Sequence, residues 1–289
     1  MGDLSAVQPI VASLVLQYDR NATILDTRLL ASSTQAEVFL VNIEGRPRPL
    51  IAKLFREQRP DVSAALEDEF VSLGLMSGAF RDVDLEGWEV AAPQPLSRSS
   101  TPPALLMTAV PGVPLQKLLP TLEASVRRDI ARRVCDALVA YWSSAGRIVA
   151  DVTLSNILAD AGKRQLSFVD PGLPIPEFAC PGLPAEFAPG SRDLSYLLSH
   201  VLATNVRAGL FARRRAQVRT AFAVDVVRNY AAEHLKSDQL RAFYDEVNSC
   251  AARYIAFIPG GGPLAPWRWF VRRQTRRRLT VVLATLARR

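Results

Sequence analysis

Short apolar segments separated by turn residues dominate the first part of the chain. Segments 23–30, 36–42 and 49–54 each combine β-branched and apolar side chains over about the length of one strand. The second and third are separated by IEGRPR, in which Gly45 and Pro47 are typical turn residues. We therefore predict three strands, the last two of which form a hairpin.

A helical pattern follows these strands. The sequence Pro-Asp-Val-Ser at 60–63 is typical of a helix start. After it, apolar residues recur at helical spacing at Leu66, Phe70, Leu73 and Met76. This pattern predicts a helix with one apolar face directly after the third strand.

The chain changes character at 110–114, where two prolines and a glycine interrupt it. Before this break, strand-like segments at 88–92 and 104–109 flank the turn-rich sequence PQPLSRSSTPP. After it, two short strands are predicted at 156–159 and 165–169, and helical patterns cover 125–145, 193–203, 212–232 and 237–257. We predict two parts, a β-rich part at 1–109 and a helical part at 110–289.

Candidate chemistry is concentrated in the sequences ADVTLSNIL and FVDPG of the second part. Asp151 and Asn156 stand five positions apart, and Asp170 follows the next predicted strand, close to Gly172. Carboxylate and amide oxygens are the hard donors that magnesium prefers. Phosphoryl transfer also needs a carboxylate near the acceptor hydroxyl. These residue types at this spacing therefore suit metal-assisted phosphoryl transfer.

The two sequences resemble the catalytic loop and the metal-binding motif of the protein-kinase-like superfamily. They are most similar to the bacterial aminoglycoside and choline phosphotransferases and the lipopolysaccharide-core sugar kinases. The resemblance implies an α+β, two-lobed fold with a small β-rich N-lobe carrying one main helix, and a helical C-lobe. It also implies ATP and Mg²⁺ as cofactors, with Asp151 as the catalytic carboxylate and Asn156 and Asp170 as metal ligands. Asp193 resembles the aspartate that braces the catalytic loop.

The resemblance extends to the first part of the chain. It implies a nucleotide-binding lysine on the third strand, and LIAKLF supplies Lys53. Its partner would be a glutamate on the next helix, for which Glu69 is the better match and Glu67 the alternative. Thr108 to Val110 would line the adenine pocket through backbone groups. The motifs occur in the family's order over roughly residues 25 to 200.

Two departures from the family pattern open alternatives. The phosphate-covering loop, ASSTQA at 31–36, contains no glycine, so Ser33 and Thr34 would have to supply its donors. Only 22 residues separate Asp170 from Asp193, too few for a long activation segment. The alternatives are a pseudokinase that binds a partner protein without catalysis, and an atypical serine/threonine protein kinase.

The positive charge is concentrated at the end of the chain. The net charge is +7, yet 253–289 contains nine arginines and no acidic residue. Trp267, Trp269 and Phe270 stand among these arginines. An anionic membrane surface, a nucleic-acid backbone and simple packing of a terminal helix on the core are all compatible with this composition. The resemblance implies a hydroxyl on a small molecule or an envelope sugar as phosphate acceptor. The short activation segment and the basic end favour an anionic glycolipid.

The remaining composition points to the cytoplasm. Three widely spaced cysteines and two histidines form no metal-binding or disulfide pattern in the sequence. The first residues lack the basic start of a secretory signal, and no apolar run approaches the ~20 residues that span a bilayer. We expect a cytoplasmic protein, with the inner face of a membrane as a further location.

Overall fold

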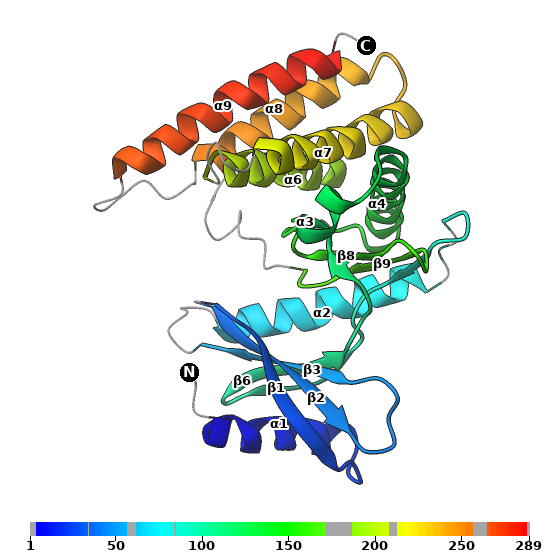
Figure 1. Cartoon of the computed structure of the whole chain (residues 1–289), viewed down its shortest axis with the longest axis vertical. Helices are drawn as coiled ribbons and strands as arrows, with labels where there is room; N and C mark the ends of the chain where they lie inside the picture. The colour runs from blue at the N-terminus through cyan, green and yellow to red at the C-terminus, as the bar shows by residue number, and fades with distance from the viewer. Residues whose placement is uncertain are drawn as a thin grey trace. The chain divides into compact units, whose positions relative to one another are not determined.

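The chain folds into two compact units (Figure 1). The computed structural model describes residues 4–33, 35–56, 62–81, 83, 85–171, 187–207, 213–256 and 265–287. The first unit consists of Met1–Gly78 and Ala92–Val110, and the second of Ala79–Ala91 and Pro111–Arg289. The first is built on a sheet and the second is mainly helical, which confirms the expected α+β class.

An antiparallel sheet in the order β1-β2-β3-β6-β5 forms the first unit. Its strands are β1 (Ile24–Ser32), β2 (Ala36–Ile43), β3 (Leu50–Phe55), β5 (Pro95–Ser100) and β6 (Pro103–Thr108). The predicted hairpin is confirmed, because β2 and β3 pair from Ala36 opposite Phe55 to Val41 opposite Leu50. The sequence prediction missed β5, whose serine-rich segment was expected to be a turn and instead pairs with β6.

Each face of this sheet is covered by a helix, α1 (Leu4–Tyr18) on one and α2 (Val62–Phe80) on the other (Figure 1). The alternation of side chains along β6 divides the core. Ala104 and Leu106 pack with α1, whereas Leu105 and Met107 pack with α2. Because both faces of β6 are covered, its residues read as a continuous apolar run.

Helix α1 is not indicated by the sequence pattern. It contains Pro9, which costs about 3 kcal/mol in a helix interior. Val7, Val11 and Leu14 are buried against the sheet, and each buried side chain of this size contributes about 1.5–3 kcal/mol. The hydroxyl of Ser97 also donates to the carbonyl of Leu14 at 2.7 Å. Packing against β5 and β6 therefore supports a helix that local propensity does not.

A small sheet in the order β4-β9-β8-β7 belongs to the second unit. Its strands are β4 (Glu89–Ala91), β7 (Val113–Pro114), β8 (Ile157–Asp160) and β9 (Gln165–Phe168). β4 pairs with β9 in parallel, and the other pairs are antiparallel. Phe80 packs against Tyr141 and Phe168, with ring centroids 6.4 and 5.3 Å away. Segment 79–91 therefore shares the core of the second unit.

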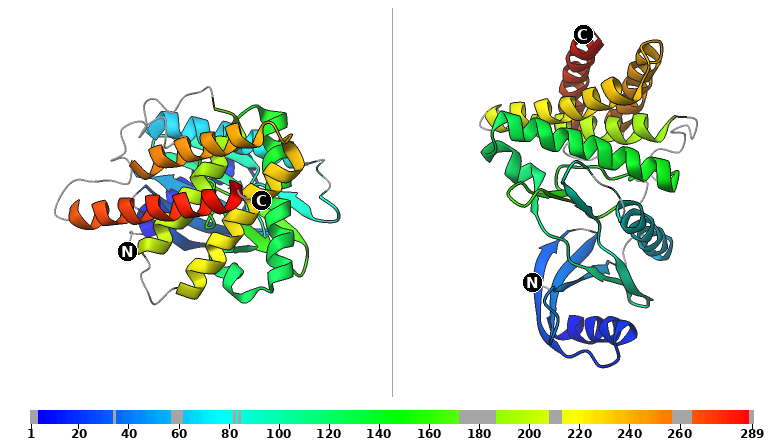
Figure 2. Two further views of the ribbon diagram at one scale, coloured as in Figure 1. Left: turned by 90° about the horizontal axis from the view of Figure 1, so that it is seen from above. Right: turned by 90° about the vertical axis from the view of Figure 1, so that its right-hand side faces the viewer.

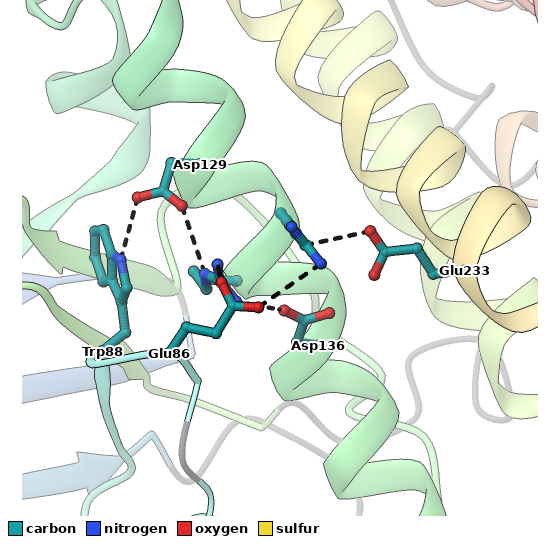
Figure 3. A network of polar contacts seen from close by, with 7 residues as sticks. Glu86, Trp88, Asp129, Asp136 and Glu233 are labelled. Carbon is teal, nitrogen blue, oxygen red and sulfur yellow. Dashed lines mark hydrogen bonds and ion pairs between the residues drawn. The ribbon is translucent and has the colours of Figure 1, made fainter.

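Charged residues reinforce this connection (Figure 3). Arg133 on helix α4 (Ala124–Ala145) is 5% exposed and forms ion pairs with Glu86, Asp129 and Asp136. The indole of Trp88 donates to Asp129 at 3.2 Å. A buried arginine is stable only when it is paired, so this network holds the 79–91 segment on α4.

The helices of the second unit gather around one central helix, α6 (Pro189–Arg207) (Figure 2). Leu194, Leu197, Leu198 and Val201 on α6 are almost fully buried. The other helices are α3 (Leu115–Leu118), the short 3₁₀ helix η1 (Leu119–Thr121), α7 (Arg213–His234), α8 (Leu240–Ala256) and α9 (Ala265–Ala287). Helix α6 begins at Pro189, four residues before the predicted start, so Asp193 lies inside the helix.

Helix α9 packs on α6 and α8 through one face (Figures 1 and 2). Val271, Thr275, Leu279, Leu283 and Leu286 form this buried face. Within the described part of the chain, neither α9 nor any other helix combines the length and the apolar character needed to cross a membrane.

Candidate functional site

The first unit contains a desolvated ion pair between Lys53 and Glu69. Lys53 on β3 donates from Nζ to both carboxylate oxygens of Glu69 on α2, at 2.7 and 2.8 Å. The two side chains are 12% and 4% exposed. Glu67, the alternative partner, instead pairs with Arg98 at 2.8 Å. The sheet and the helix thus hold one cation in a fixed position.

The loop between β1 and β2 is closed by the hydroxyl of Ser33. This hydroxyl accepts from the backbone N–H of Gln35 and Ala36 at 3.1 and 3.0 Å, and donates to the carbonyl of Ala36 at 3.1 Å. Thr34, the other residue expected to contact phosphate here, lies outside the described residues. The hydroxyl of Ser33 is therefore part of a serine-stabilised turn that replaces the glycine-rich sequence of the family.

Arg56 lies beside this loop and was not singled out by the sequence analysis. Its guanidinium donates to the hydroxyl of Ser32 at 3.0 Å and to the carboxylate of Glu37 at 3.2 Å. Its backbone N–H donates to the carbonyl of Gln35 at 2.9 Å. With 43% of its side chain exposed, Arg56 is a second cation next to the loop that the resemblance assigns to phosphate.

The segment expected to line an adenine pocket follows β6. The backbone N–H of Thr108 donates to the carbonyl of Gln94 at 3.0 Å, and the hydroxyl of Thr108 accepts from the N–H of Gln94 at 2.8 Å. The N–H of Ala109 donates to the carbonyl of Pro49 at 3.3 Å. These two amides serve the sheet, which leaves Val110 as the candidate donor of this segment.

In the second unit, Asp193 on α6 accepts three hydrogen bonds. The donors are the indole of Trp142 at 2.8 Å and the backbone N–H groups of Val149 and Ala150 at 2.7 and 3.0 Å. Asp193 is 1% exposed, and burial raises the pKa of its carboxyl to about 6, against the opposing effect of these donors. Asp193 therefore holds the backbone at Val149 and Ala150, as expected for a bracing aspartate.

This brace acts on a strained segment of backbone directly before Asp151. Ala150 has a φ of 70°, a left-handed conformation that is unfavourable for a residue with a side chain. Strained residues of this kind persist only when surrounding contacts hold them. The bonds from Val149 and Ala150 to Asp193 supply that restraint, and they hold the backbone that leads into Asp151.

Asp151 and Asn156, the two polar residues of the loop, contact each other. The amide nitrogen of Asn156 donates to the carboxylate of Asp151 at 2.9 Å and to its backbone carbonyl at 3.2 Å. The amide oxygen of Asn156 is then the atom that would coordinate a cation. The backbone carbonyl of Asn156 accepts from the N–H of Val169 at 2.8 Å, which ties the loop to the end of β9.

Asp170 follows this tie directly and also has a left-handed backbone, with a φ of 53°. Gly172 of the predicted metal-binding motif lies outside the described residues. The pKa of Tyr196 on α6 is raised, chiefly by burial and then by the negative charge of Asp151. The sequence analysis missed Tyr196, which has no recognisable local motif.

The observations within the two units match one architecture. A lysine on the third strand pairs with a glutamate on the next helix, and an Asp–Asn loop is braced by a buried aspartate. These are contacts that the sequence resemblance implied for a protein-kinase-like fold.

Solved structures with this fold are similar to the chain at low identity. The aminoglycoside phosphotransferase APH(2")-IIia, in complex with GDP and kanamycin, is 11% identical with a TM-score of 0.48, over 96% of this chain and 98% of the other. The PknI kinase domain of Mycobacterium tuberculosis is 18% identical with a TM-score of 0.45, over 80% and 96%. The kinase PK-1 of Cydia pomonella granulovirus is 17% identical with a TM-score of 0.45, over 93% and 92%. Neither a protein-family model nor a curated protein matches the sequence.

A separate polar cluster lies between α4 and α7. Ligand atoms of Cys135, Asp136 and His234 are all within 4.8 Å of one another. The pKa of the Cys135 thiol is raised, chiefly by burial and also by the charge of Asp136, which disfavours the thiolate that binds metals. Asp136 also accepts from Arg133 at 3.1 Å. This cluster is therefore explained by the packing of the two helices.

Proposed function

We propose that the chain is a phosphotransferase that uses ATP and Mg²⁺ to phosphorylate a hydroxyl group. The observation that carries this proposal is the Asp151–Asn156 loop held by Asp193. Two backbone hydrogen bonds to a buried carboxylate maintain a strained backbone immediately before the candidate catalytic residue. The Lys53–Glu69 pair supports the same proposal from the first unit.

The donor set fits magnesium and a nucleotide. Asp170 offers a carboxylate, and Asn156 offers an amide oxygen whose orientation is set by the bonds of its amide nitrogen. Lys53 would contact phosphate oxygens while Glu69 keeps its ammonium in place. When bound, Mg²⁺ and ATP supply the transferable phosphoryl group and the charge that neutralises it.

Asp151 would act on the acceptor. Its carboxylate would accept the proton of the attacking hydroxyl as the new oxygen–phosphorus bond forms, and ADP would leave. The amide of Asn156 hydrogen-bonds to Asp151 and would orient its carboxylate. We infer a small molecule or a sugar-bearing lipid as acceptor, since 22 residues between Asp170 and Asp193 leave little room for a protein-substrate platform.

A second candidate function is a pseudokinase that binds nucleotide or a partner protein without transfer. The closed turn at Ser33 favours it, because the serine hydroxyl is used within the loop. A catalytically active chain would then have to contact phosphate through other groups, of which Arg56 is the nearest described cation on this loop.

Three measurements on three variants distinguish these functions. The first is stabilisation by ATP with and without Mg²⁺, the second is ADP release with a panel of hydroxyl acceptors, and the third is self-phosphorylation. A ligand at a hundredfold excess over its Kd stabilises a protein by about 2.7 kcal/mol. Asp170→Asn should lose the Mg²⁺-dependent part, and asparagine tolerates the left-handed backbone at this position. Asp151→Asn should keep nucleotide stabilisation and lose turnover by about 10²-fold or more.

Lys236→Met is the control for Lys53→Met, because Lys236 is an exposed lysine outside the proposed site. Removing Lys53 alone leaves Glu69 buried without its cation, which costs about 3–5 kcal/mol and can prevent folding. Asp170→Asn therefore remains the decisive variant. Nucleotide stabilisation without turnover or self-phosphorylation would favour the pseudokinase. Self-phosphorylation that Asp151→Asn abolishes would assign a protein kinase, and absence of any nucleotide effect would refute the proposal.

A further inference from the structure

Helix α9 presents an unusual combination of exposed aromatic and basic side chains. Trp267, Trp269 and Phe270 in its first turns are 46%, 57% and 40% exposed. The arginines that follow them are exposed at positions 273, 276, 277 and 278. Together these seven residues are termed the aromatic–arginine surface. No acidic residue occurs in the sequence after Glu246, so α9 carries no negative side chain to compensate this charge.

The position of this surface follows from how α9 packs. Val271, Thr275 and Leu279 face the core, at the helical spacing of one buried stripe. Phe270 and Arg277 are exposed and lie on the opposite side of the helix, two turns apart along the same face. Packing of the terminal helix on the core therefore explains the buried stripe and leaves the exposed tryptophans without an explanation.

A hollow flanks α9 on each side, and each is lined by aromatic and arginine side chains. The hollow between α6, α7 and α9 has a volume of about 740 Å³ and includes Trp267, Phe270, Arg213 and Arg278 in its lining. The hollow between α8 and α9 has a volume of about 550 Å³ and includes Trp269 with four arginines, at positions 272, 273, 276 and 277. Both hollows combine an apolar ring with guanidinium groups, which bind phosphate as bidentate donors.

The geometry of the aromatic rings helps to decide between two negatively charged partners, a single-stranded nucleic acid and an anionic lipid bilayer. Trp267 stacks on Phe270 with centroids 5.5 Å apart and planes 22° from parallel. The guanidinium of Arg273 lies 5.1 Å from the centre of the Trp269 ring. Proteins that bind single-stranded nucleic acid need open ring faces on which bases stack. Here one face of the Trp267 ring is covered by Phe270, and the Trp269 ring lies beside the Arg273 guanidinium, so contacts within the helix compete with the stacking of bases.

We propose that the aromatic–arginine surface docks the protein on an anionic lipid bilayer. Tryptophan is favoured at the boundary between head groups and acyl chains, and arginines on an amphipathic helix are attracted to anionic lipids. The rings insert at this boundary, the arginines contact phosphate groups, and the two flanking hollows accept head groups. This docking does not depend on the phosphotransferase activity.

The test is co-sedimentation of the full-length protein with lipid vesicles in the absence of nucleotide. Vesicles of phosphatidylcholine alone are compared with vesicles that also contain phosphatidylglycerol. We expect binding to the anionic vesicles only, and weaker binding as salt screens the arginines. Each arginine near an anionic surface raises the binding constant for the vesicles by about a factor of five. The double variant Arg273→Gln/Arg277→Gln should therefore bind roughly 30-fold more weakly.

Two further variants separate charge from insertion. Trp269→Ser removes an exposed ring, so folding should be retained while vesicle binding weakens by roughly tenfold. Arg28→Gln/Lys163→Gln removes the same amount of positive charge from exposed positions on β1 and in the β8–β9 turn, and should bind like the unaltered chain. Circular dichroism of each variant verifies that the fold is intact.

Several outcomes would overturn the proposal. Equal binding to neutral and anionic vesicles, or no binding to either, would exclude an anionic bilayer as the partner. Equal loss in the Arg28→Gln/Lys163→Gln control would assign the effect to net charge. Tighter binding to a single-stranded RNA oligonucleotide than to anionic vesicles, at equal phosphate concentration, would assign the surface to nucleic acid.

Discussion

Replacing Asp193 by alanine tests whether one buried carboxylate holds the loop that leads into Asp151 in place. The substitution leaves three donors, the indole of Trp142 and the backbone N–H groups of Val149 and Ala150, without their acceptor. Asp193 is 1% exposed, so water cannot readily take its place. The strained backbone of Ala150 also loses the bonds that restrain it.

The size of the effect follows from two opposing contributions. A buried donor left without a partner costs about 1–3 kcal/mol, so three donors cost about 3–9 kcal/mol. Part of this loss of stability is offset, because the alanine variant no longer buries a charged carboxylate. The pKa of Asp193 is raised to about 6 from 3.8, which corresponds to about 3 kcal/mol for the charged form at neutral pH. We therefore expect a net loss of about 3 kcal/mol from the free energy of unfolding.

Denaturant unfolding followed by circular dichroism measures this loss. A double-mutant cycle with Trp142→Phe isolates one of the three bonds, since phenylalanine lacks the indole donor. Asp193→Ala should cost about 1–2 kcal/mol less in the Trp142→Phe background. Hydrogen exchange of the Val149 and Ala150 amides gives a local measure, and both should exchange faster in Asp193→Ala.

The reasoning would be wrong if Asp193→Ala lost less than about 1 kcal/mol and the two amides kept their protection. Water or a neighbouring group would then satisfy the donors, and Asp193 would not be the brace of the loop. If Asp193→Ala had the same cost in the Trp142→Phe background, the coupling energy would be zero. The indole would then not belong to the network, and the two backbone bonds would remain its members.

Two further predictions follow from the backbone and from pH. As pH falls from about 6 to about 4, the unaltered chain should gain about 2 kcal/mol of stability relative to Asp193→Asn. The reason is that the folded state holds the Asp193 proton up to a pKa of about 6, whereas the unfolded state releases it near 3.8. Urea unfolding at several pH values checks this, and a relative loss of stability on acidification would contradict it. In the same assay, Gly112→Ala should lower the free energy of unfolding by about 3 kcal/mol. Gly112 has a φ of 119°, and a Cβ there would lie 2.9 Å from the backbone nitrogen of Ala159. The control is Gly78→Ala on α2, where a Cβ meets no atom within 4 Å, and which should be neutral or stabilising by up to about 1 kcal/mol.

Local patterns were sufficient for most of the framework. The β2–β3 hairpin and the apolar face of α2 were predictable because strand alternation, turn residues and helical spacing are properties of neighbouring positions. Helix α1 and strand β5 were not. Pro9 and a serine-rich segment give the wrong local signal, and both elements form because each packs on the same sheet.

Part of the candidate site could also be predicted from the chain. Lys53, Glu69 and Asp193 stand in the order and spacing of a known motif set, and the structure forms the expected Lys53–Glu69 pair and the brace on the catalytic loop. The assignment of Asn156 and Asp170 to a metal stays a prediction. Thr34 and Gly172 lie outside the described residues.

Other parts of the site depend on contacts between residues that no sequence window brings together. Tyr196 lies on a helix more than 40 positions after Asp151, whose negative charge helps to raise the pKa of Tyr196. The hydroxyl of Ser33 is used within its own turn, and Arg56 returns to that turn from the end of β3. Cys135, Asp136 and His234 meet only because α4 packs on α7.

The candidate residues for phosphoryl transfer are thus predicted from residue type, order and spacing, since those encode local geometry. Which of them are strained, desolvated or already engaged depends on neighbours supplied by other elements. Burial raises the pKa of Asp193 and the left-handed backbone at Ala150 is maintained only because α6 packs beneath the loop. A linear sequence does not contain the dielectric environment of a side chain, and that environment exists only once the chain has folded.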